Sequence, residues 1–464
     1  MKSDKAKKIS LSLSLILALI LFFCLYLINL ESENNLNNND RHQSIKDSSA
    51  KANEDTRLIE NKSIYKKDKP GELTKVYLKV FETEDEDGHI YNFNDFDLVT
   101  KWDTEFAPIL NANIQFYSKD IQPKDNQPNY PNSIIKVRGD KGAGLKSYRV
   151  KLMDGIKGFQ GQSVFNFNKS LNDPSRIANK IAHDLIKDLD NICGFRTNFL
   201  EVYIKDGSVN EGQSEFISYG LYTHIEQPNK SYLKSRGLDV KGSLYKAEDF
   251  YFQPTDLLRN TDDLQYDKQA FETVLGIREG KDHSKLLQML KDINDESKDF
   301  DKVFNTYFDE DNYLTWLSVN IILGNYDAMS KGFLLYNSTS TSVWYLLPWE
   351  FNSIFRCMED DGENPNILDK LTDVTLHRRY LEQEGNANKL MEKIDELMSD
   401  SFSSNKIKLL KKNYKPILIE MMNEYPDSVL LNMPLNNYIA YIDQIDQQIL
   451  LNYRSFIDWY KYQD

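Results

Sequence analysis

Two carboxylates in the second half of the chain stand where a phosphoryl-transfer site would need them. A strongly apolar stretch, residues 312–323, predicts a helix that ends at Gly324, and Asp327 follows on the next loop. A predicted hairpin then leads to Glu350, 23 residues after Asp327. A loop aspartate can orient a substrate hydroxyl and accept its proton, and an acid after the hairpin can hold Mg²⁺ on phosphates. Spacing alone is weak evidence, because two acids also flank a hairpin by chance.

A glycine-rich turn between two predicted strands strengthens this interpretation. Residues 134–139 and 147–153 alternate apolar and polar side chains, as strands do, and a glycine-rich turn lies between them. The backbone N–H groups of such a turn can cover phosphates. Lys146, Arg149 and Lys151 can bring positive charge to them. Basic residues alternate along the second strand, so they cannot all point into one cleft.

The surrounding patterns predict a mixed α+β domain. Further strand-like alternation occurs at residues 74–81, 198–207 and 217–227. An Asp-Pro start signal and helical apolar spacing predict a helix over residues 173–189. The polar section from 246 to 301 is also expected to be helical, and from about residue 368 to the end the pattern is mainly helical.

Six short stretches together resemble the spore coat protein H (CotH) family of atypical protein kinases, in the family's order, across roughly residues 75–464. They are IKVRGDKGAGLKSYRVKL, DPSRIANKIAHDL, YGLYTHIEQPNKSYL, KGSLYKAED, NIILGNYD and WYLLPWE. The resemblance implies a two-lobed, protein-kinase-like α+β fold that uses ATP with Mg²⁺ or Mn²⁺. It also implies phosphorylation of Ser or Thr in a protein substrate, which in bacteria is known from the setting of the spore coat.

The resemblance also implies roles for individual residues. Asp327 matches the catalytic aspartate of the family. Lys146 matches the lysine before Ser-Tyr-Arg and is the first candidate for a phosphate contact, with Lys151 the second. Arg149 belongs to the same ATP-binding set. Glu226 matches the glutamate of the Glu-Gln motif, at or near the nucleotide pocket.

The expected metal ligands depart from the family pattern. Glu350 and Asn352 stand where the family usually has two aspartates, so one charge is kept on a longer side chain and the other is lost. Gly332 stands where the family usually has a metal-binding Asn. Arg356 replaces the usual glycine, and either contacts phosphate or is an ordinary surface residue.

Three readings of the active site follow from these departures. The first is an active kinase with a non-standard metal site. The second is a pseudokinase that keeps the fold and acts as a scaffold in coat or envelope assembly. The third, a carboxylate-based hydrolase, needs two acids facing each other around a sugar, and nothing else in the sequence supports it.

The N-terminus predicts a membrane anchor. Residues 1–8 carry four lysines, and the uncharged apolar run 9–30 is long enough to cross a hydrocarbon core of ~30 Å. The basic flank predicts that residues 1–8 form a cytoplasmic tail and that the chain after residue 30 lies on the outer side of the cell membrane. A location in the spore envelope fits the same orientation. A cleaved signal peptide is the alternative. Residues 31–71 read as a flexible linker, 72–367 as the kinase-like domain, and 368–464 as its helical C-terminal part.

Charge and cysteine usage narrow the possible partners. The net charge is -14, which argues against nucleic-acid binding, since that requires basic surface to meet phosphates. An acidic surface instead favours a basic, Ser- and Lys-rich protein substrate. The three cysteines, Cys24, Cys193 and Cys357, form no disulfide framework, and no CxxC or HExxH spacing indicates zinc.

Overall fold

The computed structural model describes residues 57–100, 106–118, 128–139, 144–208, 215–355 and 367–461, with side chains from residue 370 onward in the last range. The chain divides into a unit from Met1 to Arg57 and a compact unit from Leu58 to Asp464. The expected cytoplasmic tail and membrane anchor, residues 1–30, lie outside the described residues, as does Arg356. Among the described residues, no helix is both long and apolar enough to span a bilayer.

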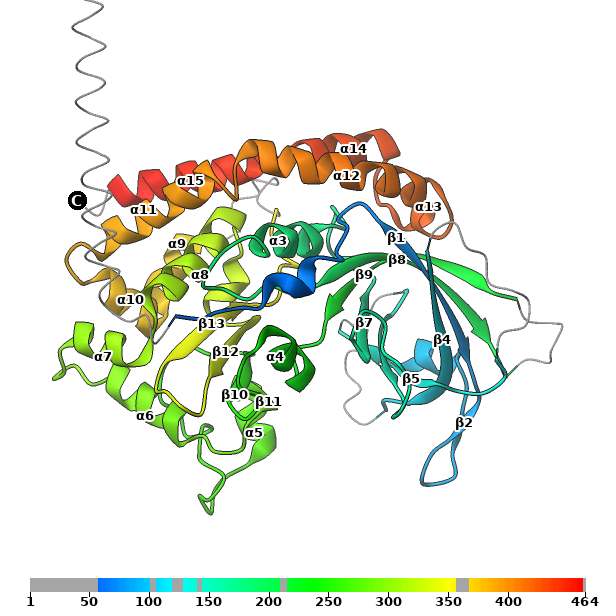
Figure 1. Cartoon of the computed structure of the whole chain (residues 1–464), viewed down its shortest axis with the longest axis horizontal. Helices are drawn as coiled ribbons and strands as arrows, with labels where there is room; N and C mark the ends of the chain where they lie inside the picture. Colours follow the sequence, from blue (N-terminus) through cyan, green and yellow to red (C-terminus); the bar gives the residue numbers. More distant parts are fainter. Residues whose placement is uncertain are drawn as a thin grey trace, which may run out of the picture. The chain divides into compact units, whose positions relative to one another are not determined.

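Seven of the described strands close into a barrel (Figure 1). Their order around it is β1 (Leu73–Val80), β4 (Leu110–Ser118), β5 (Ser133–Arg138), β6 (Ser147–Leu152), β7 (Val164–Asn168), β9 (Ile217–Glu226) and β8 (Thr197–Asp206). The neighbours pair antiparallel except β1 and β8, which run parallel from Leu73↔Phe199 to Val80↔Asp206. Alternate side chains such as Tyr148 and Val150 fill the interior, as the two-residue period of the sequence predicts.

A second sheet carries the hairpin that leads to the candidate catalytic acids. Its strand order is β11 (Leu275–Glu279), β10 (Ser243–Ala247), β12 (Phe333–Asn337) and β13 (Trp344–Pro348). Helix α8 (Glu310–Leu323) packs against β13, where the Asn312 amide bonds both the N–H and the C=O of Leu346. The helix ends at Gly324 with φ 66°, a left-handed conformation that glycine adopts at low cost. The hairpin and the cap confirm the sequence prediction.

The remaining helices complete the compact unit. Before α8 they are η1 (Lys62–Tyr65), α2 (Asp95–Leu98), α3 (Ala178–Ile186), α4 (Lys230–Arg236), α5 (Lys268–Val274), α6 (Ser284–Ile293) and α7 (Phe300–Tyr307). After it come η2 (Tyr326–Met329), α9 (Ile367–Asp373), α10 (Thr375–Leu381), α11 (Asn386–Ser399), α12 (Ser404–Asn423), α13 (Asp427–Leu430), α14 (Leu435–Asp443) and α15 (Ile445–Lys461). Helices α11 and α15 contact α8. The C-terminal helices therefore belong to the same unit as the barrel.

Two of the predicted elements differ from the structure. The helix expected over residues 173–189 spans only Ala178–Ile186. Asp173 lies in the turn before it, where its carboxylate accepts the Ala178 N–H at 2.9 Å. The section 246–301, expected to be helical, also contains strand β11, which pairs with β10. The mixed α+β class is confirmed.

The compact unit begins before the end of the expected linker. Leu58 is buried, and Glu60 forms an ion pair with Arg236 at 2.9 Å. Asp68 forms another with Lys187 at 2.7 Å. The predicted linker end at residue 71 is therefore wrong, and the compact unit begins at Leu58. Polar residues of this segment belong to that unit because they pair with buried charged side chains. We call residues 58–69 the N-terminal strap.

Candidate active site

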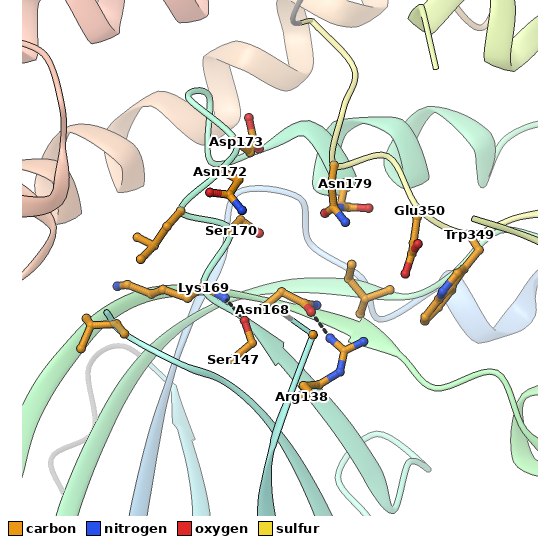
Figure 2. Close-up of a pocket in the computed structure, with 15 residues that line it drawn as sticks. Arg138, Ser147, Asn168, Lys169, Ser170, Asn172, Asp173, Asn179, Trp349 and Glu350 are labelled. Carbon is orange, nitrogen blue, oxygen red and sulfur yellow. Dashed lines mark hydrogen bonds between the residues drawn. The ribbon is translucent and has the colours of Figure 1, made fainter. Parts of the chain in front are cut away.

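A cavity of about 170 Å³ lies where the barrel meets the end of the second sheet (Figure 2). The lining comes from six parts of the fold: the end of β5, the start of β6, the end of β7 with the loop after it, α3, β9, and the residues that follow β13. The side chains used below are Arg138, Asn168, Lys169, Asn179, Glu350 and Asn352. Figure 2 shows the Glu350 carboxylate and the Arg138 guanidinium on one side of this space. Opposite charges therefore share the cavity wall.

The segment after β13 is fixed by its backbone and by neighbouring amides. The Glu350 N–H donates to the Gly332 carbonyl at 2.8 Å, and the Asn325 side chain donates to the Glu350 carbonyl at 2.9 Å. The Asn352 side-chain oxygen accepts from the Asn179 amide of α3. These bonds hold the main chain, so that the Glu350 side chain, 38% exposed, is presented at the cavity.

Asp327 lies on the short helix η2, directly after the cap of α8. Its carboxylate accepts a hydrogen bond from the Ser353 hydroxyl at 2.8 Å and pairs with Lys331 at 3.0 Å. The side chain is one third exposed, which leaves room for a substrate hydroxyl. The Lys331 N–H bonds the Asp327 carbonyl, and the adjacent Gly332 holds Glu350, so both predicted acids belong to one hydrogen-bonded loop system. Asp327 itself is not part of the cavity lining.

Charged residues of the second sheet form a series of ion pairs that ends at Glu350. Lys246 on β10 places its Nζ 3.2 Å from the Glu350 carboxylate and 3.0 Å from that of Glu248. Arg278 on β11 lies 3.5 Å from the other oxygen of Glu248. One oxygen of the Glu350 carboxylate is therefore already paired with Lys246, whose charge would compete with a metal ion bound there.

Two arginines approach from the barrel. Arg138 donates to the Asn168 side-chain oxygen, and burial lowers its pKa to about 10, with repulsion from Arg149 adding to the shift and Glu350 opposing it. Arg149 donates to the Asn166 side-chain oxygen at 3.2 Å. Burial, followed by repulsion from Arg278, also lowers the Arg149 pKa. Both of these hydrogen bonds go to neutral side-chain amides, so they do not neutralise the positive charge of the two arginines.

The predicted lysines do not line the cavity. Lys146 shares the inward side of its strand with Tyr148, is buried, and donates from Nζ to the Val99 carbonyl at 3.1 Å. Lys151 is on the outer side and is exposed. Because side chains alternate along a strand, Lys146 and Lys151 point to opposite sides of the sheet, and neither of them lines the cavity.

Glu226 lies behind the cavity wall in a buried ion network. Its carboxylate meets Arg236 at 2.8 Å and also Arg196, and Arg236 in turn meets Glu60 of the N-terminal strap at 2.9 Å. Burial by itself would raise the pKa of Glu226, but Arg236 and Arg196 outweigh it and hold the value at about 2. The structure therefore places Glu226 in the scaffold, whereas its neighbour Ile225 lines the cavity.

Sequence reasoning assigned no site role to several residues of the cavity wall, among them Arg138, Asn179 and Lys169. Arg138 lies at the end of a predicted strand, and Asn179 lies in a predicted helix. Lys169 is a buried lysine whose Nζ donates to Asp427 at 2.8 Å and to the Tyr219 carbonyl at 2.6 Å. Burial lowers its pKa to about 8, against the opposing pull of Asp427. The sequence signal that could have identified Arg138 is its position at the end of a strand that enters a glycine-rich turn, since loops often carry functional residues.

The donor set at the cavity suits a divalent cation that is shared with phosphates. Glu350 offers a carboxylate and Asn352 an amide oxygen, both at the cavity wall. Mg²⁺ is usually bound by one or two carboxylates, with waters and substrate phosphates completing its shell. Within the described ranges, a tighter cluster of possible ligands occurs only at Asp85, Asp87 and His89, which are exposed residues of the β2–β3 hairpin (Thr83–Glu84 and Ile90–Tyr91).

The protein thus has a mixed α+β fold, with a cavity between the barrel and the second sheet that is lined by both acidic and basic side chains. A profile of the family described as CotH kinase protein matches residues 135–447. The chain belongs to this family.

Two individual proteins can be compared with the chain. Inner spore coat protein H of Bacillus subtilis (strain 168) is 27% identical over 214 residues, which is 45% of this chain. The match spans 54%, about half, of that relative's length. The crystal structure of a Helicobacter pylori proinflammatory kinase, CtkA, aligns with 67% of this chain and 94% of its own, at 9% identity and a TM-score of 0.23. A likeness at that score supports no argument about fold or activity.

Proposed function

We propose that this protein is an extracytoplasmic atypical protein kinase that transfers the γ-phosphate of ATP to Ser or Thr of a protein, in spore coat assembly. The observation that carries the proposal is the shared cavity wall of Glu350, Asn352 and Arg138, joined through one loop system to Asp327. In this proposal, the barrel and the second sheet with its helices are the two lobes of a kinase-like fold. Family membership and the similarity to a spore coat protein support it.

Each residue has a definite task in the proposed reaction. Phosphoryl transfer depends mainly on positioning and on neutralising charge, so few side chains suffice. Asp327 orients the acceptor hydroxyl and accepts its proton, while Ser353 and Lys331 fix the carboxylate. Glu350 and Asn352 hold Mg²⁺ or Mn²⁺, which neutralises charge on the phosphates when bound. Of the ATP-binding residues predicted from sequence, Arg149 lies near enough to Arg138 for the two charges to repel each other. Lys146 and Glu226 belong to the scaffold, and Lys151 is an exposed residue outside the cavity lining.

A transfer assay tests the kinase proposal. Protein comprising residues 57–464 is incubated with labelled ATP, Mg²⁺ or Mn²⁺, and a Ser- and Lys-rich protein. We expect phosphate on the acceptor, and a loss of at least about a hundredfold in rate for Asp327→Asn. Asp256→Asn, which removes a fully exposed aspartate, is the matched control and should keep the wild-type rate. Equal rates for wild type and Asp327→Asn would refute the proposed role of Asp327.

A pseudokinase scaffold is the second candidate, because Lys246 already neutralises Glu350 and Asn352 carries no charge. Thermal stabilisation by ATP without transfer in either metal would favour this candidate. For an active kinase, the acidic chain should make transfer to basic acceptors weaken with added salt. Transfer that does not respond to salt would argue against a basic substrate.

A further inference from the structure

Asp327, the proposed catalytic base, already binds a hydroxyl group of its own chain. The Ser353 hydroxyl donates to Oδ2 of the Asp327 carboxylate at 2.8 Å, and the Lys331 ammonium group lies 3.0 Å from Oδ1. A general base must lie about 2.6–3.2 Å from the oxygen whose proton it accepts, and the contact between Ser353 and Asp327 meets this requirement. Ser353 therefore has the contact with Asp327 that the hydroxyl of a substrate serine would need.

The turn that carries Ser353 is fixed on both sides. Phe351 before the serine is buried, as are Ile354 and Phe355 after it. The Tyr441 hydroxyl of α14 also donates to the Phe355 carbonyl at 3.0 Å. Phe355 has φ +67°, a conformation that persists in a residue with a side chain only where the surrounding structure enforces it. Ser353, itself only partly buried, is therefore held at Asp327 by the turn.

The same turn follows directly on two residues of the cavity wall. Glu350 and Asn352 line the cavity, and Ser353 is the next residue along the chain. Asn325, two residues before Asp327, donates from its side-chain amide to the Glu350 carbonyl at 2.9 Å. The proposed metal ligands, the hydroxyl and the base thus belong to one hydrogen-bonded loop system.

We propose that Ser353 is a phosphorylation site, at which the protein modifies its own chain in cis. The inference rests on the proposed function. The Ser353 Oγ forms a bond to the γ-phosphorus of ATP as its proton passes to Asp327, the bond from that phosphorus to the β–γ bridging oxygen breaks, and ADP leaves with the electron pair. The phosphoserine then carries about two negative charges beside the Asp327 carboxylate, which it repels, and it blocks the acceptor position. Self-phosphorylation therefore stops transfer to other acceptors.

Phosphate mapping by mass spectrometry tests the site directly. Protein comprising residues 57–464 is incubated with ATP and Mg²⁺ or Mn²⁺, without an added acceptor. We expect a single phosphate per chain, on Ser353, at a rate that does not depend on protein concentration, because the transfer occurs within one molecule. Asp327→Asn should slow the modification by at least about a hundredfold, and Ser353→Ala should abolish it.

Ser340→Ala is the matched control for the mapping. It removes an exposed serine from the turn between β12 and β13, at the opposite end of β13 from Ser353. The Ser340→Ala protein should be phosphorylated as wild type is. Ser353→Thr keeps a hydroxyl and should still accept phosphate. If Ser353→Ala does not fold, as judged by circular dichroism, the mapping on wild type and on Ser353→Thr carries the test.

A preincubation experiment separates an acceptor from a residue that only supports Asp327. Preincubation with ATP should lower the wild-type rate of transfer to an added Ser- and Lys-rich protein by at least about tenfold, because the phosphoserine repels Asp327. The rate of Ser353→Ala protein, compared with its own rate before preincubation, should not change. If Ser353 only supported Asp327, preincubation would change neither rate.

The outcomes separate self-phosphorylation from the proposed function. Phosphate on an added protein but none on Ser353 would overturn the self-phosphorylation and leave the kinase intact. Phosphate on Ser353 but on no added protein would support the self-phosphorylation and refute transfer to a protein substrate. The absence of phosphate from both would refute both. Phosphate on Ser353 of a tagged Asp327→Asn protein that is mixed with wild type would show transfer between molecules and overturn the cis step.

Discussion

Two charged clusters of the protein have opposite balances. The buried network of Glu60, Arg236, Glu226 and Arg196 has two carboxylates for two guanidinium groups. A second cluster, which we call the arginine seam, consists of Arg138, Arg149, Lys246, Glu248, Arg278 and Glu350; it has four cations for two carboxylates, and its members Arg138 and Glu350 line the cavity. A balanced buried network holds parts of the chain together, whereas an unbalanced one at a cavity is suited to a ligand. The comparison explains why a glutamate predicted at the nucleotide pocket belongs to the scaffold instead.

Removing the N-terminal strap should give the largest effect on the balanced cluster. A protein that begins at Gly71 lacks Glu60 and Asp68, and so leaves Arg236 and Lys187 short of a buried counter-charge. We expect it to unfold about 5 kcal/mol more easily than a protein that begins at Arg57. Urea denaturation of both proteins measures the difference. Equal urea midpoints would show that the strap is not part of the folding unit.

Glu226→Gln should destabilise the fold by about 3 kcal/mol, because it leaves two buried guanidinium groups with one carboxylate. The matched control is Glu382→Gln, which removes an exposed partner of Arg378 and should cost less than about 1 kcal/mol. Denaturation curves give both values. If Glu226→Gln were as stable as wild type but no longer bound ATP, Glu226 would belong to the binding site and the comparison would fail.

Acid should weaken the same network through Glu226. Its pKa in the folded protein is about 2, below the ordinary value of 4.5, so its contribution to stability is present above pH 4.5 and is lost as the pH falls towards 2. Glu60 acts in the opposite direction, since burial raises its pKa. We therefore expect the loss of stability between pH 4.5 and 3 to be smaller in Glu226→Gln than in wild type. Equal slopes of unfolding free energy against pH would contradict the role of Glu226.

The smallest expected effect concerns the metal side of the arginine seam. Gly332 has φ +70°, and an added Cβ would lie 3.2 Å from the Glu350 Cβ and 3.3 Å from its Oε2. Gly332→Asn should cost about 1 kcal/mol, and roughly 0.5 kcal/mol less when Glu350→Asp withdraws the carboxylate. Thermal denaturation of the single and double variants measures the coupling.

Gly385→Asn is the control for this coupling. Gly385 has a similar φ of +81° but nothing within 4 Å of an added Cβ. Its substitution reports the backbone cost alone and should not depend on Glu350. Coupling to Glu350 as strong at position 385 as at 332 would show that the effect does not arise from contact.

Most of the elements could be predicted because their patterns are local. The alternation in β1, β5 and β6 and the apolar run of α8 follow from which side of each element is buried. The strap could not be predicted in this way, because its polar composition resembles a linker. Its order comes from partners such as Arg236 and Lys187, which are more than a hundred residues away in the chain.

The candidate site was predicted only in part for the same reason. Asp327, Glu350 and Asn352 are close in sequence, so a hairpin and a cap suffice to bring them near one another. The basic residues depend on which way a strand faces and on what lies opposite. Lys146 points to the barrel interior, whereas Arg138 reaches the cavity, where the charges of Glu350 after β13 and Arg278 on β11 act on it.

The sequence by itself determined the family, the α+β class, and the loop and hairpin that carry the acids, since each depends on residues that are neighbours along the chain. Only the tertiary structure decided which charges are paired and which face the cavity. Those outcomes depend on burial and on distances between elements remote in sequence, and electrostatic energies change steeply with both.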